Sequence, residues 1–294
     1  MENSLWNKIA FWQKTQSKVD LGVYLSAGEL TVFEPSAQPS HMKIAFEQHD
    51  WHSAFSQLTR ELSGANLQIV LSADYYQLLV VDRPAVEETE MSQALQWAIK
   101  DMVSAPVTEL HLDYFETPQS TANKLTVVVV ERALLSNMVT VAEQLGITIA
   151  GISIEEMAIS NLSKDAHQAK LVLCHKPGSE LMLTVIKQGQ LFMQRSVRGF
   201  SQIDSVAAAE LSFGVADNLS LELQRSMDYF ESQLRQAPVT SIELLMGGAR
   251  EELAKLLSTN FNQQVNVVEC QSVADKLSEL AYLEFSLSVQ EEAA

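Results

Sequence analysis

The sequence predicts an α/β protein of two lobes, with an α+β insert in the first lobe. Apolar runs of strand length alternate with longer amphipathic runs of helical period, which is typical of α/β proteins. Residues 21–33 and 171–187 each read as a strand, a short turn and a second strand. With 47% apolar side chains, a 294-residue chain can also fill a sizeable core. The repeated opening indicates an internal duplication.

The first lobe opens on a predicted hairpin whose strands, over 21–25 and 30–33, flank the turn-like break Ser26-Ala27-Gly28-Glu29. The period of the apolar residues predicts the elements that follow: a helix over 49–62, a strand over 67–71, then the insert with a strand over 77–81, a helix over 87–102, strands over 110–116 and 125–130 and a helix over 132–145. Gly146 ends that helix, and the lobe closes with a strand over 147–152 and a short helix over 155–162.

The second lobe begins after the polar break Ser163-Lys164-Asp165, which is the best candidate for a domain boundary. Its predicted elements are strands over 171–175, 181–187 and 191–197, a helix over 218–234, a strand over 242–245, a helix over 249–257, a strand over 265–268 and a last helix. We therefore expect an N-terminal amphipathic segment at 1–20, a first lobe at 21–165 with the insert at about 75–147, and a second lobe at 166–294.

The N-terminal segment places Trp6 and Trp12 among lysines at helical spacing. It either packs on its own domain, which amphipathic helices usually do, or lies on a membrane surface. The sequence has no run near the roughly 20 apolar residues that span a bilayer, and it lacks a signal peptide. We expect a soluble, cytoplasmic protein, and the Met1 start and acidic end favour a complete chain.

The charge of the chain excludes some partners. Its 37 acidic and 20 basic residues give a formal net charge of −17, which repels phosphates and anionic lipids. Nucleic acid is therefore not an expected partner. The two cysteines, Cys174 and Cys270, are too few for a disulfide framework and are interpreted as small buried hydrophobic residues in a reducing compartment.

Conventional catalytic and metal sites receive little support. His49 and His52 lack the further ligands that a metal site needs. His111 and Asp113 share one face of a predicted strand, but no nucleophile turn accompanies them, so we interpret them as a cross-strand polar pair. The glycine-rich motifs of P-loop, Rossmann and α/β-hydrolase proteins are absent from the sequence. We expect no metal site.

Several short segments occur in a fixed order from about Leu21 onward. They are 80–84 (VVDRP), 94–97 (ALQW), 112–114 (LDY), 127–133 (VVVVERA), 145–147 (LGI) with 154–155 (IE), 187–191 (KQGQL), 223–230 (LQRSMDYF) and 246–249 (MGGA). The ordered set resembles the PilM family of type IV pilus assembly proteins and, within it, the MshI branch that serves the mannose-sensitive haemagglutinin (MSHA) pilus. This resemblance implies the actin-like, two-lobe ATPase fold of FtsA and PilM.

The resemblance also locates the two phosphate turns of an actin-like ATPase, each of which carries an aspartate that helps to hold hydrated magnesium. Tyr24 and His175 stand at these two positions. A phenol and an imidazole lack the negative charge that organises magnesium and a hydrolytic water. We therefore expect a pseudo-ATPase without a bound cofactor, and binding of ATP with magnesium is the alternative.

A vestigial nucleotide site would consist of small residues in the turns and polar residues on one helix face, as the resemblance places them. The set is Ser26, Gly28, Gly178, Ser179, Glu222, Arg225, Ser226, Gly247 and Gly248. Two substitutions weaken it: Pro177 removes a backbone donor from the second phosphate turn, and Met246 replaces an expected glycine.

The resemblance implies a protein partner. PilM-like proteins bind the cytoplasmic N-terminal segment of a PilN-like inner-membrane protein in a groove between the first lobe and the insert. Here an extended peptide would gain main-chain hydrogen bonds from the 77–83 strand. The expected groove residues are Leu78, Leu79, Val80, Val81 and Trp97.

We accordingly expect a cytoplasmic scaffold at the inner face of the inner membrane of a Gram-negative bacterium. It would reach the membrane through its partners, and the pilus motor ATPase is a further candidate partner. The alternatives are an active actin-like ATPase and the cytoplasmic domain of a type II secretion L-like protein, which shares the implied fold.

Overall fold

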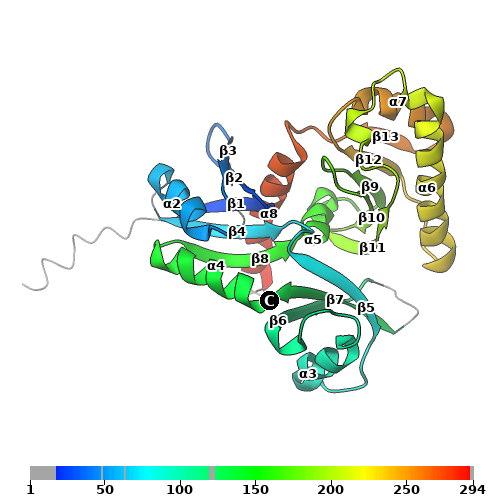
Figure 1. Ribbon diagram of the computed structural model, residues 1–294. Helices are drawn as coiled ribbons and strands as arrows, with labels where there is room; N and C mark the ends of the chain where they lie inside the picture. Colours follow the sequence, from blue (N-terminus) through cyan, green and yellow to red (C-terminus); the bar gives the residue numbers. More distant parts are fainter. Residues whose placement is uncertain (1–17, 48, 63, 119–122, 292–294) are drawn as a thin grey trace, which may run out of the picture.

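The computed structural model describes residues 18–47, 49–62, 64–118 and 123–291. The prediction for Trp6 and Trp12 therefore lies outside the described residues. Each half of the chain contains a five-stranded mixed sheet, and a three-stranded sheet projects from the first half (Figure 1).

The first sheet is built around β1 (Val19–Leu25) and β4 (Ala65–Leu71), which pair in parallel. β1 also pairs in antiparallel fashion with β2 (Glu29–Glu34), and β2 with β3 (Ser40–Ala45). β8 (Thr148–Ile154) pairs in parallel with β4 and gives the order β3-β2-β1-β4-β8.

The second sheet repeats this arrangement. β9 (Lys170–Cys174) pairs in antiparallel fashion with β10 (Leu181–Lys187), which pairs with β11 (Gln190–Val197). On its other side β9 pairs in parallel with β12 (Ser241–Leu245), which pairs with β13 (Gln264–Val267). The order β11-β10-β9-β12-β13 matches the first sheet strand for strand, as the predicted duplication requires.

The insert is a small α+β unit. Its antiparallel sheet has the order β5 (Tyr76–Asp82), β7 (Lys124–Glu131), β6 (Leu110–Phe115), and a 3-10 turn at Val107–Glu109 precedes β6. The helix α3 (Glu88–Ile99) covers one face of this sheet. Together they bury a separate small core of Val81, Met91, Leu95, Ile99, Leu110, Leu125, Val127 and Val129.

The remaining helices cover the two large sheets. From the first lobe to the second they form three layers: α2 (Trp51–Glu61) with α4 (Arg132–Gln144), then α5 (Glu155–Ser160) with α8 (Val273–Glu291) between the sheets, then α6 (Ala216–Asp228) with α7 (Arg250–Asn260). Because buried residues of α5 and α8 belong to one hydrophobic cluster with residues of both sheets, the two lobes share a central core (Figure 1).

The last helix returns to the first lobe, where it packs on β1, β2 and β4. Gly22 permits this contact, since a Cβ atom there would lie 2.1 Å from the carbonyl oxygen of Ser278 and 2.5 Å from the backbone nitrogen of Tyr282. Only glycine allows so close a backbone approach. The domain boundary between residues 165 and 166 stays a prediction. The helix α8 belongs by sequence to the predicted second lobe but packs on strands of the first lobe.

The predicted order of strands and helices is present, with one addition. The helix predicted over 49–62 begins at Trp51, after Asp50, whose carboxylate caps it by accepting the Ser53 N–H at 3.0 Å. The sequence pattern does not predict β3, because Ile44 alone among its residues is fully buried. This strand lies at the edge of the sheet and shows little alternation.

Candidate functional site

The two lobes meet at a buried cluster of Tyr24, Glu155 and Lys176. Tyr24 comes from β1, Glu155 opens α5, and Lys176 follows β9 in the second lobe. The Tyr24 hydroxyl donates to Glu155 Oε1 at 2.7 Å, and Lys176 Nζ donates to Tyr24 Oη at 3.1 Å and to the Glu155 carboxylate. The lysine of one lobe therefore neutralises a carboxylate whose side chain is 3% exposed.

The surroundings of Tyr24 keep its hydroxyl protonated. Burial, together with the Glu155 carboxylate, raises the pKa of Tyr24 well above its ordinary value, so the phenol stays a neutral donor. A second pair lies beside it, in which the Tyr76 hydroxyl donates to Glu156 Oε2 at 2.6 Å. Burial raises the pKa of Glu156 and that of Tyr76.

His175 is fully buried next to this cluster. Its Nδ1 lies 3.8 Å from a carboxylate oxygen of Asp204, which is too far for a direct hydrogen bond. Burial lowers the pKa of His175, so the imidazole is neutral at pH 7. It supplies no negative charge to a cation.

Polar groups of the predicted phosphate turns form hydrogen bonds with other groups of the protein. The Ser26 hydroxyl and the Ser26 backbone N–H both donate to the Glu29 carbonyl, at 3.1 and 3.0 Å. The carbonyl of Gly28 accepts from Phe46, at 3.0 Å. In the second turn, Gly178 adopts a φ of +75° and Ser179 N–H donates to the Lys176 carbonyl at 3.1 Å.

The predicted nucleoside-side residues occupy two separate places. Gly247 and Gly248 follow β12, and a Cβ atom on Gly248 would lie 2.1 Å from the Asp204 carbonyl oxygen. Glu222, Arg225 and Ser226 lie on α6, and the cavity lined by Arg225 and Ser226 is shared with the insert rather than with the glycine turn.

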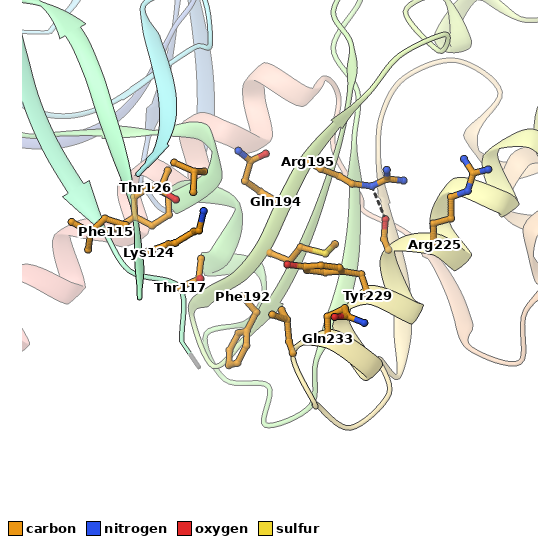
Figure 2. Close-up of a pocket in the computed structure, with 15 residues that line it drawn as sticks. Phe115, Thr117, Lys124, Thr126, Phe192, Gln194, Arg195, Arg225, Tyr229 and Gln233 are labelled. Atoms are coloured by element: carbon orange, nitrogen blue, oxygen red, sulfur yellow. Dashed lines mark hydrogen bonds between the residues drawn. The ribbon is translucent and has the colours of Figure 1, made fainter. Parts of the chain in front are cut away.

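Arg195 of β11 holds the polar face of α6, and the sequence analysis missed it. Its guanidinium donates to Ser226 Oγ at 3.0 Å (Figure 2). It also donates to the Glu222 carbonyl at 3.0 Å and to the Glu222 carboxylate. These bonds lower the pKa of Glu222. The only signal in the sequence is a charged residue in a strand whose neighbours are mostly apolar.

The predicted groove residues do not all face one way. Leu79 and Val81 pack in the core of the insert, and Leu78 packs toward the first lobe. Val80 is 57% exposed and lines a cavity facing the second lobe. Trp97 is 67% exposed on α3, with the Lys100 ammonium 5.2 Å from its ring centroid.

A groove between the first lobe and the insert is found at another pair of strands. β6 ends the insert sheet and β8 ends the first sheet, so within the described ranges each has a strand neighbour on one side only. A cavity of about 240 Å³ lies between them. It is lined by Leu71, His111, Asp113, Tyr114, Phe115, Val128, Val130, Leu135, Ile152, Ser153, Ile154 and Met157.

Other sequence candidates have structural explanations. His49 packs against Trp51 and Tyr75, and the described residues contain no group of three His, Cys, Asp or Glu side chains placed to hold a metal. Cys174 is buried, as predicted. The prediction for Cys270 is wrong: it is half-buried, and its sulfur accepts from Arg250 at 3.3 Å. The helices of the described ranges include none with the length and apolarity needed to cross a bilayer.

Two repeated five-stranded sheets with α5 and α8 between them define an actin-like fold, which confirms the predicted fold class. No protein-family model and no curated protein sequence matches the chain.

Solved structures do match. The chain is similar to a "PilM-PilN type IV pilus biogenesis complex", with a TM-score of 0.61 and 16% identity over 90% of this chain and 98% of that one. It is also similar to the cytoplasmic domain of EpsL, an inner-membrane component of the type II secretion system of Vibrio cholerae, with a TM-score of 0.53 and 14% identity over 90% and 94%. A third match is a Bacteroides thetaiotaomicron protein of actin-like ATPase fold and unknown function, with a TM-score of 0.52 and 10% identity over 90% and 95%.

Proposed function

We propose that this protein is a PilM-like assembly scaffold that binds an extended cytoplasmic segment of a PilN-like inner-membrane protein. The observation that carries the proposal is the groove between β6 and β8, which combines two strand edges that no described strand covers with a largely apolar cavity. An extended peptide can add main-chain hydrogen bonds to such edges and place alternate side chains in the cavity. The likeness to a PilM-PilN complex supports this partner class.

This location differs from the predicted one on β5. β5 is also a sheet edge, but its exposed Val80 lines the cavity that faces the second lobe. Trp97, which is exposed on α3, does not line that cavity. The β6 and β8 groove lies between the first lobe and the insert, with Ile152 36% exposed on one wall and Tyr114 on the other. We therefore place the peptide there.

The proposed scaffold does not hydrolyse nucleotide. The Lys176 ammonium group pairs with Glu155 and donates to Tyr24. At this place an actin-like ATPase would need free carboxylates for hydrated magnesium. The turns around Ser26 and Ser179 already use backbone donors that phosphates would require. These residues do not fit a magnesium nucleotide, so we propose a pseudo-ATPase.

The cellular setting follows from the same proposal. A PilN-like partner places the protein at the cytoplasmic face of the inner membrane of a Gram-negative bacterium. The segments that resemble the MshI branch favour service to an MSHA-type pilus. The motor ATPase of the pilus stays a further candidate partner.

The groove is tested by calorimetric titration with a synthetic N-terminal peptide of the PilN-like protein from the same organism. Ile152→Lys puts a charge on the groove wall and should weaken peptide binding at least tenfold, about 1.4 kcal/mol. Val80→Lys tests the β5 location, and Leu221→Lys, on the exposed face of α6, is the matched control. Both should bind within twofold of the unmodified protein. A loss confined to Val80→Lys would move the peptide to β5.

The likeness to the EpsL cytoplasmic domain favours a second candidate, a type II secretion L-like role. It ranks second because its TM-score and identity are lower than those of the PilM match. Binding of the PilN-like peptide distinguishes the two, since a secretion L-like protein has no reason to bind that peptide in this groove.

A further inference from the structure

A cavity of about 540 Å³ lies between the insert and the second lobe, apart from the proposed peptide groove. Residues of β6 and β7 line it on the insert side, and residues of β11 and α6 line it on the side of the second lobe. Figure 2 shows Lys124 of β7 on one side of β11 and Arg225 of α6 on the other. The strand β11 therefore lies in the middle of the lining.

The edge of β11 is open to this cavity. β11 ends the second sheet, so among the described strands it has a neighbour, β10, on one side only. Four consecutive residues of β11 line the cavity: Phe192, Met193, Gln194 and Arg195. Successive side chains of a strand point to opposite faces, so a cavity against one face is lined by alternate residues. Lining by consecutive residues indicates that the cavity follows the strand edge, where backbone N–H and C=O groups are presented.

The insert offers a poorer edge to the same cavity. β5 is an edge strand of the insert sheet, but Val80 alone of its residues lines the cavity. Its neighbours Leu79 and Val81 pack in the core of the insert. The cavity therefore touches one face of β5, whereas it runs along the edge of β11.

The charge of this cavity is opposite to that of the chain, whose formal net charge is −17. The described residues that line it include Lys124, Arg195 and Arg225 and no acidic residue. Arg195 and Arg225 share the carboxylate of Glu222, and Arg225 points away from the insert. Lys124 extends toward β11, and its partner Asp82 is weak, at 3.7 Å with side chains 49% and 88% exposed. Lys124 is thus the cation best placed to meet a ligand on the edge of β11.

We propose that the edge of β11 binds an extended, acidic segment of a partner protein, with one carboxylate of that segment paired to Lys124. The added strand gains main-chain hydrogen bonds from β11, and its side chains alternate between the insert side and the α6 side. The partner differs in charge from a ligand of the groove between β6 and β8, because the described lining of that groove contains no lysine or arginine. The inference is independent of that groove.

The probe is a fluorescein-labelled peptide of about eight residues in which glutamate alternates with valine. It is titrated with the whole protein and followed by fluorescence anisotropy, and we expect saturable binding below about 1 mM. The same peptide with glutamine in place of glutamate should bind at least fivefold more weakly. A version N-methylated at every backbone nitrogen has no donor for a strand edge and should bind at least tenfold more weakly.

Lys124→Gln tests the charge and should weaken binding of the glutamate peptide at least fivefold. The matched control is Lys255→Gln, which removes an exposed lysine of α7 outside the cavity and should bind within twofold of the unmodified protein. Hydrogen exchange of the unmodified protein gives the location. Backbone amides of 190–197 should exchange more slowly with the peptide bound, and those of 148–154, at the other groove, should not change.

Circular dichroism of each variant checks that it is folded. Absence of binding at about 1 mM overturns the proposal. Equal affinity of the glutamine peptide, or of Lys124→Gln and its control, overturns the acidic partner. Equal affinity of the N-methylated peptide, or protection of 148–154 in place of 190–197, overturns the strand edge of β11.

Discussion

Lys176 donates to two buried acceptors, Tyr24 and Glu155, across the boundary between the lobes. In this position an ammonium group supplies the positive charge that a bound cation would otherwise bring. The negative charge of Glu155 is therefore balanced by Lys176 of the other lobe. This ion pair holds the lobes together, while the predicted phosphate turns form hydrogen bonds within the protein.

Replacing Lys176 by Met should destabilise the protein by about 3–5 kcal/mol, because the Glu155 carboxylate is then buried without a partner. Urea unfolding measures the change. In the double variant with Glu155→Gln most of this loss should be recovered, since no charge is left unpaired. A single variant as stable as the unmodified protein would contradict the ion pair.

Gly248 and Gly178 form a matched pair for testing the contact at Asp204. Both have positive φ angles, +71° and +75°, but only Gly248 has a neighbour in the way of a Cβ atom, whereas no atom lies within 4 Å of that position at Gly178. Gly178→Ala should cost about 1 kcal/mol from backbone strain alone. Gly248→Ala should cost at least about 1 kcal/mol more in the same unfolding measurement; equal losses would contradict the close approach.

At the scale of elements, α8 carries a titratable group, Glu284, against the first sheet. Gln68 of β4 donates to Glu284 Oε2 at 2.7 Å, and Ser153 of β8 is its other polar neighbour. Burial raises the pKa of Glu284 from 4.5 to about 7. The folded state therefore keeps a proton that the unfolded chain releases at lower pH.

Stability should accordingly fall as pH rises from about 4.5 to about 7, with a contribution of about 3 kcal/mol from Glu284 at most. Glu284→Gln keeps an acceptor for Gln68 but cannot ionise. It should unfold a few degrees higher than the unmodified protein at pH 7.5 and at the same temperature at pH 4.5. Equal pH profiles for the two proteins would refute the assignment.

Most elements follow from sequence because each has a clear apolar period. β10 is an almost continuous apolar run buried on both faces, and β4 alternates apolar and polar residues before ending in the apolar run Ile69-Val70-Leu71. The helix α2 shows the spacing of Trp51, Ala54, Phe55 and Leu58. β3 is an edge strand with little to bury, so the pattern that predicts its neighbours is absent. Its existence depends on pairing with β2.

The candidate site is harder to predict from the sequence than the fold. The resemblance located Tyr24 and His175, but the partners Glu155 and Lys176 come together only because α5 lies between the two sheets. Likewise, the order of the strands leaves β6 and β8 at sheet edges, and local periodicity does not reveal which strands end a sheet. The resemblance, and not the periodicity, places the peptide groove on β5, the other edge of the insert, and that placement stays a prediction.

At the scale of the whole molecule, the shared core of α5 and α8 and the Lys176 cluster connect the lobes. Actin-like ATPases use nucleotide to change how their lobes close, which alters the surfaces that partners see. Here the bridge is built from side chains, so the groove between β6 and β8 is expected to have one form whether or not nucleotide is present.

The most direct test is calorimetric titration of the purified protein with the PilN-like N-terminal peptide, first alone and then with Mg-ATP in excess. We predict saturable peptide binding with the same Kd, within twofold, in both titrations, and no heat of binding when Mg-ATP is added to the protein alone. No peptide binding, or a Kd that changes tenfold with Mg-ATP, would contradict a nucleotide-independent scaffold.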